Sequence, residues 1–286
     1  EEPAAEPETA PAEADPVEEP AELADPEPEP AELTPEDLDL AFAAFLGRMS
    51  AYNTISLEDS NLAMVEDPAP FLLDVRNVSE AEENGHIEGA VLIPLRELGQ
   101  NLDKMPDFDT PIIAYCGSGW RATIAMTALE ALGWTDVKVM KGGSFAGWVE
   151  AGYPIVEGVP AEAAVLNAAT PNPLLAAKMD TMLSSIPEGW GVVTNEALNT
   201  ELIENGELIL IDVRTAGEVE EKGYVDTAGE LITLPIEEMI ANRDQWPDDL
   251  NAPIVVYCGS GHRSTIGMAI LRSYGFTDVR SLKGGF

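Results

Sequence analysis

The chain has 286 residues, enough for one large domain or two of ordinary size. Its 52 acidic and 15 basic residues give a formal net charge of -37, which excludes nucleic acid and anionic membranes as expected partners, because both are polyanions. No apolar run approaches the roughly 18 residues of a membrane span. The sequence begins at Glu1, without an initiator methionine or a hydrophobic signal segment, so we expect a processed product or a fragment.

Residues 1–34 are rich in Ala, Pro and Glu, with 13 acids, eight prolines and no base. Such a segment buries too little apolar surface to offset its ordering entropy. It is predicted to be an acidic, disordered tether with polyproline II character. Tethers of this kind favour an extracytoplasmic location, periplasmic or at the cell surface, with the cytoplasm as the alternative. If the tail is ordered, we expect it to lie against a basic partner in a protein assembly.

From residue 35 onward, short apolar runs alternate with helical patterns. The stretch Thr34-Pro35-Glu36-Asp37 predicts a helix start, and the apolar run "LDLAFAAFLGRM" continues it. Strands are then predicted at "PFLLDV", "AVLIP", "PIIAYC" and "VKVM". Helices are predicted at "EAEEN" and at "RATIAMTALEALG", which Gly133 closes. This alternation predicts an α/β domain with a central parallel sheet flanked by helices.

The second half of the chain repeats this order. "FLLDVR" matches "LILIDVR" at an offset of 138, and "YCGSGWRATIAM" matches "YCGSGHRSTIGM" at an offset of 142. "GWTDVKVMKGG" also matches "GFTDVRSLKGG". We therefore predict tandem domains over residues 35–156 and 174–286, joined by a linker over residues 157–173. The second copy stops at Phe286 without a counterpart of "FAGWVEAGYPIV", so its last helix is expected to be missing or cut off.

The only two cysteines, Cys116 and Cys258, occupy the same place in the repeated phrase. Each ends a predicted strand and precedes a helix through the loop C-G-S-G. Ligands bind at the carboxyl ends of parallel strands, where loop amides and the helix dipole favour thiolate over thiol. Arg121 and Arg263 are predicted to add a cation at the mouth of each loop. A buried structural cysteine, or a disulfide between loops whose Cα atoms approach within about 7 Å, is the alternative.

With these motifs the chain resembles the rhodanese family of sulfurtransferases. The resemblance rests on the DVR segments, "GHIEGA", the loops "CGSGWR" and "CGSGHR", and the ending "KGGSFAGWVEAGYPIV". It covers roughly residues 52–156 and 190–286, and it implies two rhodanese-like folds. It also implies that Cys116 and Cys258 carry a persulfide, which passes sulfur from thiosulfate or a related anionic donor to a thiol or cyanide-like acceptor. The family's chemistry needs no metal or organic cofactor.

The remaining candidate residues fall into two sets. The loop residues are assigned to substrate binding: Gly117, Ser118, Gly119, Trp120, Arg121, Gly259, Ser260, Gly261, His262 and Arg263. A second set is interpreted as structural ion pairs at strand ends: Asp74, Arg76, Glu80, Asp212, Arg214 and Glu218. Trp120 and His262 are expected to shape access to the loops. His86, which Tyr224 replaces in the second copy, is expected to form structural hydrogen bonds, and the other aromatic residues are assigned to the core.

Two other functions stay open. Cysteine phosphatases and arsenate reductases use a similar loop, but it has five residues between Cys and Arg instead of the four found here, and no general-acid aspartate is identifiable. The second alternative is a rhodanese-fold binding or scaffold subunit of a larger, extracytoplasmic assembly, since a fold does not fix a function.

Overall fold

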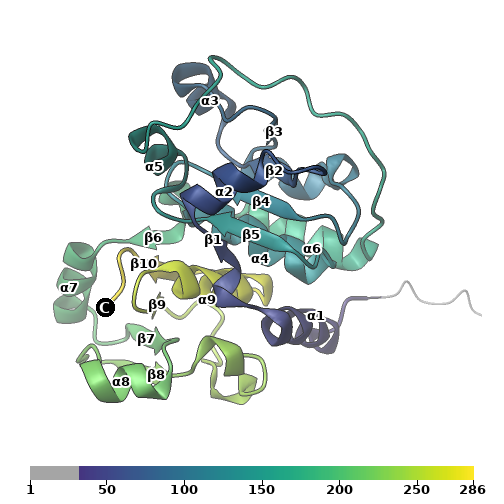
Figure 1. Cartoon of the computed structure of the whole chain (residues 1–286). Coiled ribbons are helices and arrows are strands. Elements are labelled where there is room, and N and C mark those ends of the chain that lie inside the picture. Colours follow the sequence, from purple (N-terminus) through teal and green to yellow (C-terminus); the bar gives the residue numbers. More distant parts are fainter. Residues whose placement is uncertain (1–31) are drawn as a thin grey trace, which may run out of the picture. The chain divides into compact units, whose positions relative to one another are not determined.

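The computed structural model of the chain describes residues 32–286 (Figure 1). The tether predicted over residues 1–34, and the partner contact expected for it, lie outside the described residues except at 32–34. Within the described part, no helix combines the length and the apolar character needed to cross a membrane.

Helix α1 (Pro35–Arg48) begins where the sequence predicts. The Thr34 hydroxyl accepts a hydrogen bond from the Asp37 amide, and the Asp37 carboxylate accepts one from the Thr34 amide at 2.9 Å. This reciprocal capping box satisfies backbone donors that the first helical turn leaves free. The helix buries an apolar face against α4 (Trp120–Leu132).

Each repeat folds around a five-stranded parallel sheet with the same topology. The first has the order β1-β5-β4-β2-β3, built from β1 (Thr54–Ile55), β2 (Phe71–Asp74), β3 (Val91–Leu92), β4 (Ile112–Tyr115) and β5 (Val137–Met140). The second has the order β6-β10-β9-β7-β8, built from β6 (Val192–Val193), β7 (Ile209–Asp212), β8 (Glu230–Thr233), β9 (Ile254–Tyr257) and β10 (Val279–Leu282). The prediction of two tandem α/β domains with parallel sheets is confirmed.

Helices cover both sheets. Besides α1 and α4 they are α2 (Leu57–Ala63), α3 (Val78–Asn84), α5 (Ser144–Glu150), α6 (Pro173–Ser184), α7 (Asn195–Glu204), α8 (Ala216–Lys222) and α9 (His262–Ser273). The strands and helices predicted in the first repeat are all present. The sequence did not reveal the strands β1 and β6, because each has only two residues and, unlike β3, neither lies in an apolar run of strand length.

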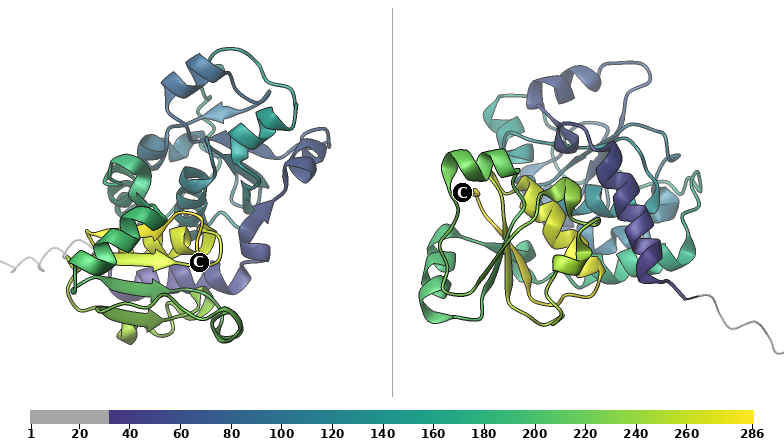
Figure 2. Two further views of the ribbon diagram at one scale, coloured as in Figure 1. Left: turned by 90° about the vertical axis from the view of Figure 1, so that its left-hand side faces the viewer. Right: turned by 90° about the horizontal axis from the view of Figure 1, so that it is seen from below.

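Helix α4 is buried on every side, not on one face as an amphipathic helix would be. Every residue from Arg121 to Leu132 is buried. The helix packs against its own sheet, against α1 and α6, and against α9 of the second repeat, and α4 and α9 lie side by side in Figures 1 and 2. One continuous apolar cluster therefore includes residues of both repeats.

The helix that leads into each repeat also contacts the other repeat. Helix α6 packs against the 3-10 helix η2 (Leu95–Gln100) of the first repeat, where Arg96 donates to the Ile186 carbonyl at 2.9 Å. In α1, Asp39 accepts a hydrogen bond from the Tyr274 hydroxyl of the second repeat at 2.6 Å. These contacts tie the repeats together, and the domain limits given above stay a prediction.

Candidate active site

Both cysteines lie at the carboxyl edge of their sheets, in loops of the same geometry. Cys116 follows β4 and precedes α4, and its Sγ accepts a hydrogen bond from the Gly119 amide at 3.1 Å. Cys258 follows β9 and precedes α9, and its Sγ accepts from the Gly261 amide at 3.1 Å. The φ angles of Gly119 and Gly261, 108° and 95°, lie in the region that only glycine adopts without strain.

Both thiols are free, which excludes a disulfide between the loops. Cys116 is 1% exposed and Cys258 is 0% exposed, so both cysteines are buried. Ser118 and Ser260, two residues further on in the loops, are exposed.

The arginine of each loop is paired with a glutamate. Arg121 holds Glu80 with both terminal nitrogens, one of them at 2.7 Å, and Arg263 holds Glu218 with both at 2.6 Å. The expected cation at each loop mouth is thus compensated, and an incoming anion competes with a carboxylate. Glu80 and Glu218, which were expected to belong to the strand-end pairs, instead form their ion pairs with the loop arginines.

Helix starts fix these glutamates in place. Glu80 and Glu218 are the third residues of α3 and α8, and each accepts a hydrogen bond from the backbone amide of its N-cap residue. Hydrogen bonds from Arg263, which outweigh partial burial, lower the pKa of Glu218 to about 2. Burial alone would lower the pKa of Arg121, but the hydrogen bonds with Glu80 and the neighbouring Cys116 raise it. Both ion pairs stay charged at neutral pH.

The strand-end pairs lie beneath the loops. Arg76 binds Asp74 at 2.6 Å and donates to the Gly85 carbonyl at 2.8 Å. In the second repeat, Arg214 binds Asp212 at 2.6 Å and donates to a glycine carbonyl at 2.7 Å. Both pairs are almost completely buried, and each links the end of a central strand to the helix that follows.

A phenylalanine of the same repeat contacts each cysteine loop. The Phe145 amide donates to the Cys116 carbonyl at 3.0 Å, and the Phe286 amide donates to the Cys258 carbonyl at 2.7 Å. Phe145 and Phe286 also cover Arg76 and Arg214, respectively. In the first repeat, the Ser144 hydroxyl also accepts from the Cys116 amide at 3.0 Å. The second repeat has no counterpart of this hydroxyl, because Phe286 directly follows Gly285.

His86 and Tyr224 have different surroundings, although they occupy matching positions. His86 forms an antiparallel bridge with Val156, and its Nδ1 lies 2.8 Å from the Gly158 carbonyl. The role expected for it, a structural hydrogen-bonding residue, agrees with these contacts. Tyr224, in contrast, is 59% exposed in the structure.

Each loop arginine is covered by an aromatic residue of the other repeat. Trp190, just before β6, lies with its ring 4.8 Å from the guanidinium of Arg121. Tyr52, just before β1, lies 4.9 Å from that of Arg263, and its hydroxyl accepts a long hydrogen bond from Arg263 at 3.4 Å. Both aromatics were assigned to the core, and both are half-buried and pack against the core cluster, but their contacts with the loop arginines were not predicted. Tyr52 and Trp190 are 138 positions apart, the same offset as between the DVR segments. This offset would have shown that the two aromatics occupy matching positions in the repeats.

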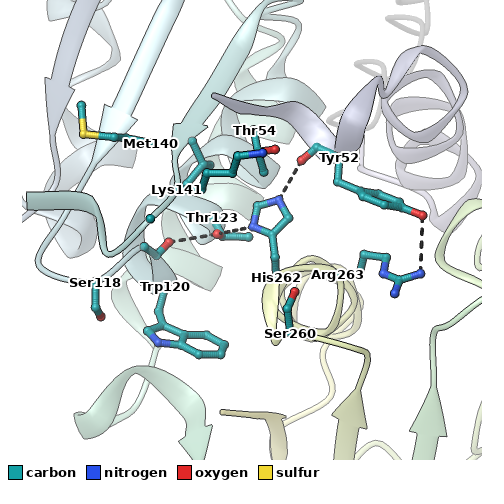
Figure 3. A pocket seen from close by; sticks show the side chains of 13 residues that line it. Tyr52, Thr54, Ser118, Trp120, Thr123, Met140, Lys141, Ser260, His262 and Arg263 are labelled. Carbon is teal, nitrogen blue, oxygen red and sulfur yellow. Dashed lines mark hydrogen bonds between the residues drawn. The ribbon is translucent and has the colours of Figure 1, made fainter. Parts of the chain in front are cut away.

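His262 and Trp120, which occupy matching positions, both lie where the loops meet (Figure 3). His262 joins the repeats: its Nε2 donates to the Tyr52 carbonyl at 2.7 Å, and its Nδ1 lies 2.9 Å from the Thr123 hydroxyl. Burial lowers the pKa of His262; the Tyr52 carbonyl opposes this shift, and the charges of Arg263 and Lys141 add to it. Trp120 packs onto Gly261, where any side chain would collide with its ring. Both residues line a cavity.

The chain is similar to proteins of one family. The sequence profile described as "Rhodanese-like domain" matches residues 58–151 and 195–286. A sulfurtransferase of Allochromatium vinosum is 30% identical over 93 residues, which cover 32% of this chain and 81% of that protein. Thiosulfate sulfurtransferase PspE of Escherichia coli is 32% identical over 71 residues, covering 24% of this chain and 67% of that protein.

A solved structure is also similar. SseA from Escherichia coli, described with the rhodanese fold and the mechanism of 3-mercaptopyruvate sulfotransferases, aligns with a TM-score of 0.39 at 20% identity and covers 82% of this chain and 98% of its own. The profile match covers more than half of the residues, once in each parallel sheet. The chain therefore belongs to the rhodanese family, in which it has two tandem domains and relatives that are named sulfurtransferases.

Proposed function

We propose that the protein is a sulfurtransferase that moves a sulfane sulfur from thiosulfate or a related donor to a thiophilic acceptor through a cysteine persulfide. The observation that carries this proposal is the repeated loop. In both repeats a free cysteine ends a central buried strand, and its sulfur accepts a backbone amide hydrogen bond. An amide aimed at sulfur stabilises the thiolate more than the thiol.

The reaction has two steps. First, the cysteine thiol loses its proton, and the thiolate attacks the outer sulfur of thiosulfate. The new S–S bond makes a cysteine persulfide, and the old S–S bond breaks to release sulfite with its electron pair. Second, cyanide or a thiolate attacks the outer sulfur of the persulfide, which returns the cysteine thiolate and releases thiocyanate or a new persulfide. The two half-reactions follow a ping-pong order.

The loops contribute electrostatics more than acid–base chemistry. The persulfide carries negative charge close to the Gly119 or Gly261 amide and to the first turn of a helix whose amides have no intrahelical acceptor. The arginine–glutamate pair fixes the rim of the loop, because each glutamate is itself held by a helix cap. Preorganised donors of this kind stabilise a charged intermediate without reorganisation.

A specific observation favours a second candidate, a rhodanese-fold binding or scaffold subunit of a larger, extracytoplasmic assembly. Both sulfur atoms are buried, and the loop arginines already have carboxylate partners. A loop that only supports a protein interface would have the same features. Persulfide chemistry separates the two candidates.

Intact-mass spectrometry with thiosulfate is the test. The wild-type protein should gain the mass of one or two sulfur atoms and release sulfite in equal amount, and cyanide should remove the added mass as thiocyanate. The Cys116→Ser, Cys258→Ser double variant should gain nothing. A mass gain that survives in the double variant would refute the assignment of the cysteines. If thiosulfate, thiosulfonates and organic persulfides all give no gain, the binding subunit becomes the better description.

A further inference from the structure

A cavity of about 470 Å³ lies where the two cysteine loops meet (Figure 3). The first repeat contributes Gly119 and Trp120 of its loop and Lys141 at the end of β5, while the second contributes Ser260 and His262 of its loop. Gly119 is also the residue whose amide binds the Cys116 sulfur. The residue whose amide holds the Cys116 thiol is therefore itself part of the cavity wall.

The cavity carries a positive charge in a strongly acidic protein. The chain has 52 acidic residues, yet none of the described residues that line the cavity is an Asp or Glu. Lys141 forms no ion pair within residues 32–286, and its charge acts on the nearby His262 ring, whose pKa it helps to lower. Arg263 is compensated by Glu218, and the lowered pKa of His262 keeps its ring neutral. The Lys141 ammonium therefore supplies the net charge of the cavity.

The size and the lining of the cavity fit an organic ligand better than an inorganic sulfur donor. Thiosulfate has only five atoms, whereas cavities above about 300 Å³ are typical of organic ligands. Apolar surface comes from Met140 and Trp120, and hydroxyl groups come from Ser118 and Ser260. A ligand that fits this lining has a carboxylate for Lys141 and an apolar or sulfur-containing body.

We infer that the cavity binds the sulfur acceptor, a low-molecular-weight thiol that carries a carboxylate, and that Lys141 holds the carboxylate. This inference rests on the proposed function and names its acceptor class. The bound thiol loses its proton to solvent, and its thiolate attacks the outer sulfur of the Cys116 persulfide. A new S–S bond forms on the acceptor, the S–S bond to Cys116 breaks, and the cysteine leaves as thiolate with that electron pair.

The repeat provides a matched control. Lys283 occupies the position of Lys141 in the second copy, with the same two glycines after it, and it does not line the cavity. Replacing either lysine by glutamine removes one exposed positive charge from the same type of loop. Only the Lys141 variant alters the cavity.

The experiment compares two acceptors, with the Cys116 persulfide preformed in a Cys258→Ser background. The second-order rate constant for sulfur transfer is measured with 3-mercaptopropionate, which is anionic, and with 2-mercaptoethanol, which is neutral. The ratio of the two constants should fall about tenfold in Lys141→Gln, since a hydrogen-bonded ion pair is commonly of this strength. It should be unchanged in Lys283→Gln and largely restored in Lys141→Arg. Comparing ratios cancels the intrinsic reactivity of the two thiols.

A second readout does not depend on catalysis. The thioether 3-(methylthio)propionate, which cannot accept sulfur, should raise the Tm of the wild type and of Lys283→Gln but not of Lys141→Gln. The uncharged 3-(methylthio)propanol should have no such effect. If no persulfide forms, the proposed function fails, and the Tm shift alone then shows whether the cavity binds a carboxylate through Lys141. If the persulfide forms but Lys141→Gln leaves both the ratio and the Tm shift intact, the inference is overturned.

Discussion

Two aromatic residues are held in backbone conformations that side chains normally avoid. Tyr52 has a φ of 54° and Trp190 has a φ of 64°, and both neighbours of each residue also have positive φ. Non-glycine residues in this region cost on the order of 1–3 kcal/mol, and such strain is concentrated at functional sites. The same strained turn occurs in both repeats, and each time it places a ring against the loop arginine of the other repeat. Both turns therefore have the same structural effect, which is to place an aromatic ring over a loop arginine.

We predict that each aromatic supports the cysteine of the opposite repeat. Trp190→Ala should slow persulfide formation at Cys116, measured in a Cys258→Ser background, and Tyr52→Ala should slow it at Cys258 in a Cys116→Ser background. A cation–π contact contributes roughly 0.5–2 kcal/mol, so the expected loss is about twofold to thirtyfold. The reason is that the uncovered guanidinium is held by its glutamate alone, so the rim of its loop becomes less rigid.

The crossed design provides its own control. Trp190→Ala should leave the rate at Cys258 within about twofold, and Tyr52→Ala should do the same for Cys116. Trp190→Phe should recover most of the rate, whereas Trp190→Leu, which fills space without a π face, should not. Equal losses at both cysteines would show that the aromatics act only through general stability.

At this scale the sequence predicted the cysteine loops and missed their partners. A local phrase such as C-G-S-G carries its own geometry, because glycine and the strand–helix junction determine it. The pairing of Glu80 with Arg121 spans 41 positions, and the contact of Tyr52 with Arg263 spans 211, so both depend on the folded topology. A comparison of the two repeats could have pointed to Tyr52 and Trp190, because they share the offset of the DVR segments, but it was not applied to them.

Among the elements, strands of four residues and helices with clear caps could be predicted. The burial of one repeat's helices by contacts with the other repeat could not. Central strands such as β4 read as apolar runs because both of their faces are covered. Helix α4 was predicted as a helix, but its burial on every side was not, since α9 of the other repeat packs against it. A single repeat contains no information on its neighbour's surface.

The residue that follows the two glycines distinguishes the repeats: it is Ser144, the first residue of α5, in one and Phe286 in the other. The first residues of α5 hold the Cys116 loop at three places, through the Ser144 hydroxyl and the amides of Phe145 and Ala146. In the second repeat Phe286 stands at the position of Ser144, so it contacts the Cys258 loop through its amide but offers no hydroxyl as an acceptor. A loop fixed at more points holds its amides in place with less reorganisation during the reaction.

We therefore predict that the first repeat is the better catalyst. In steady-state assays with thiosulfate and cyanide, Cys258→Ser should retain most of the wild-type kcat/KM, and Cys116→Ser should lose most of it. Ser144→Ala in the Cys258→Ser background should reduce the rate further, because the buried Cys116 amide loses its acceptor at a cost of about 1–3 kcal/mol. The reverse order of the two cysteine variants would show that the anchoring of the loop by α5 does not limit the rate.

For the whole molecule, the dominant quantity is the net charge of -37. An anionic donor is repelled at long range, while the acid-free lining of the cavity attracts anions at short range. The Debye length falls from about 30 Å at 0.01 M to about 8 Å at 0.15 M salt. Over this interval salt removes most of the long-range repulsion and less of the short-range attraction.

We predict that persulfide formation from thiosulfate becomes faster as salt rises over this interval, by about threefold in the second-order rate constant. Stopped-flow measurement of the donor half-reaction isolates this step from acceptor binding at Lys141. Benzenethiosulfonate, with one negative charge in place of two, serves as the control and should show about half the slope of log rate against the square root of ionic strength. A rate that falls with salt for both donors would mean that local positive charge at the loops outweighs the field of the whole protein.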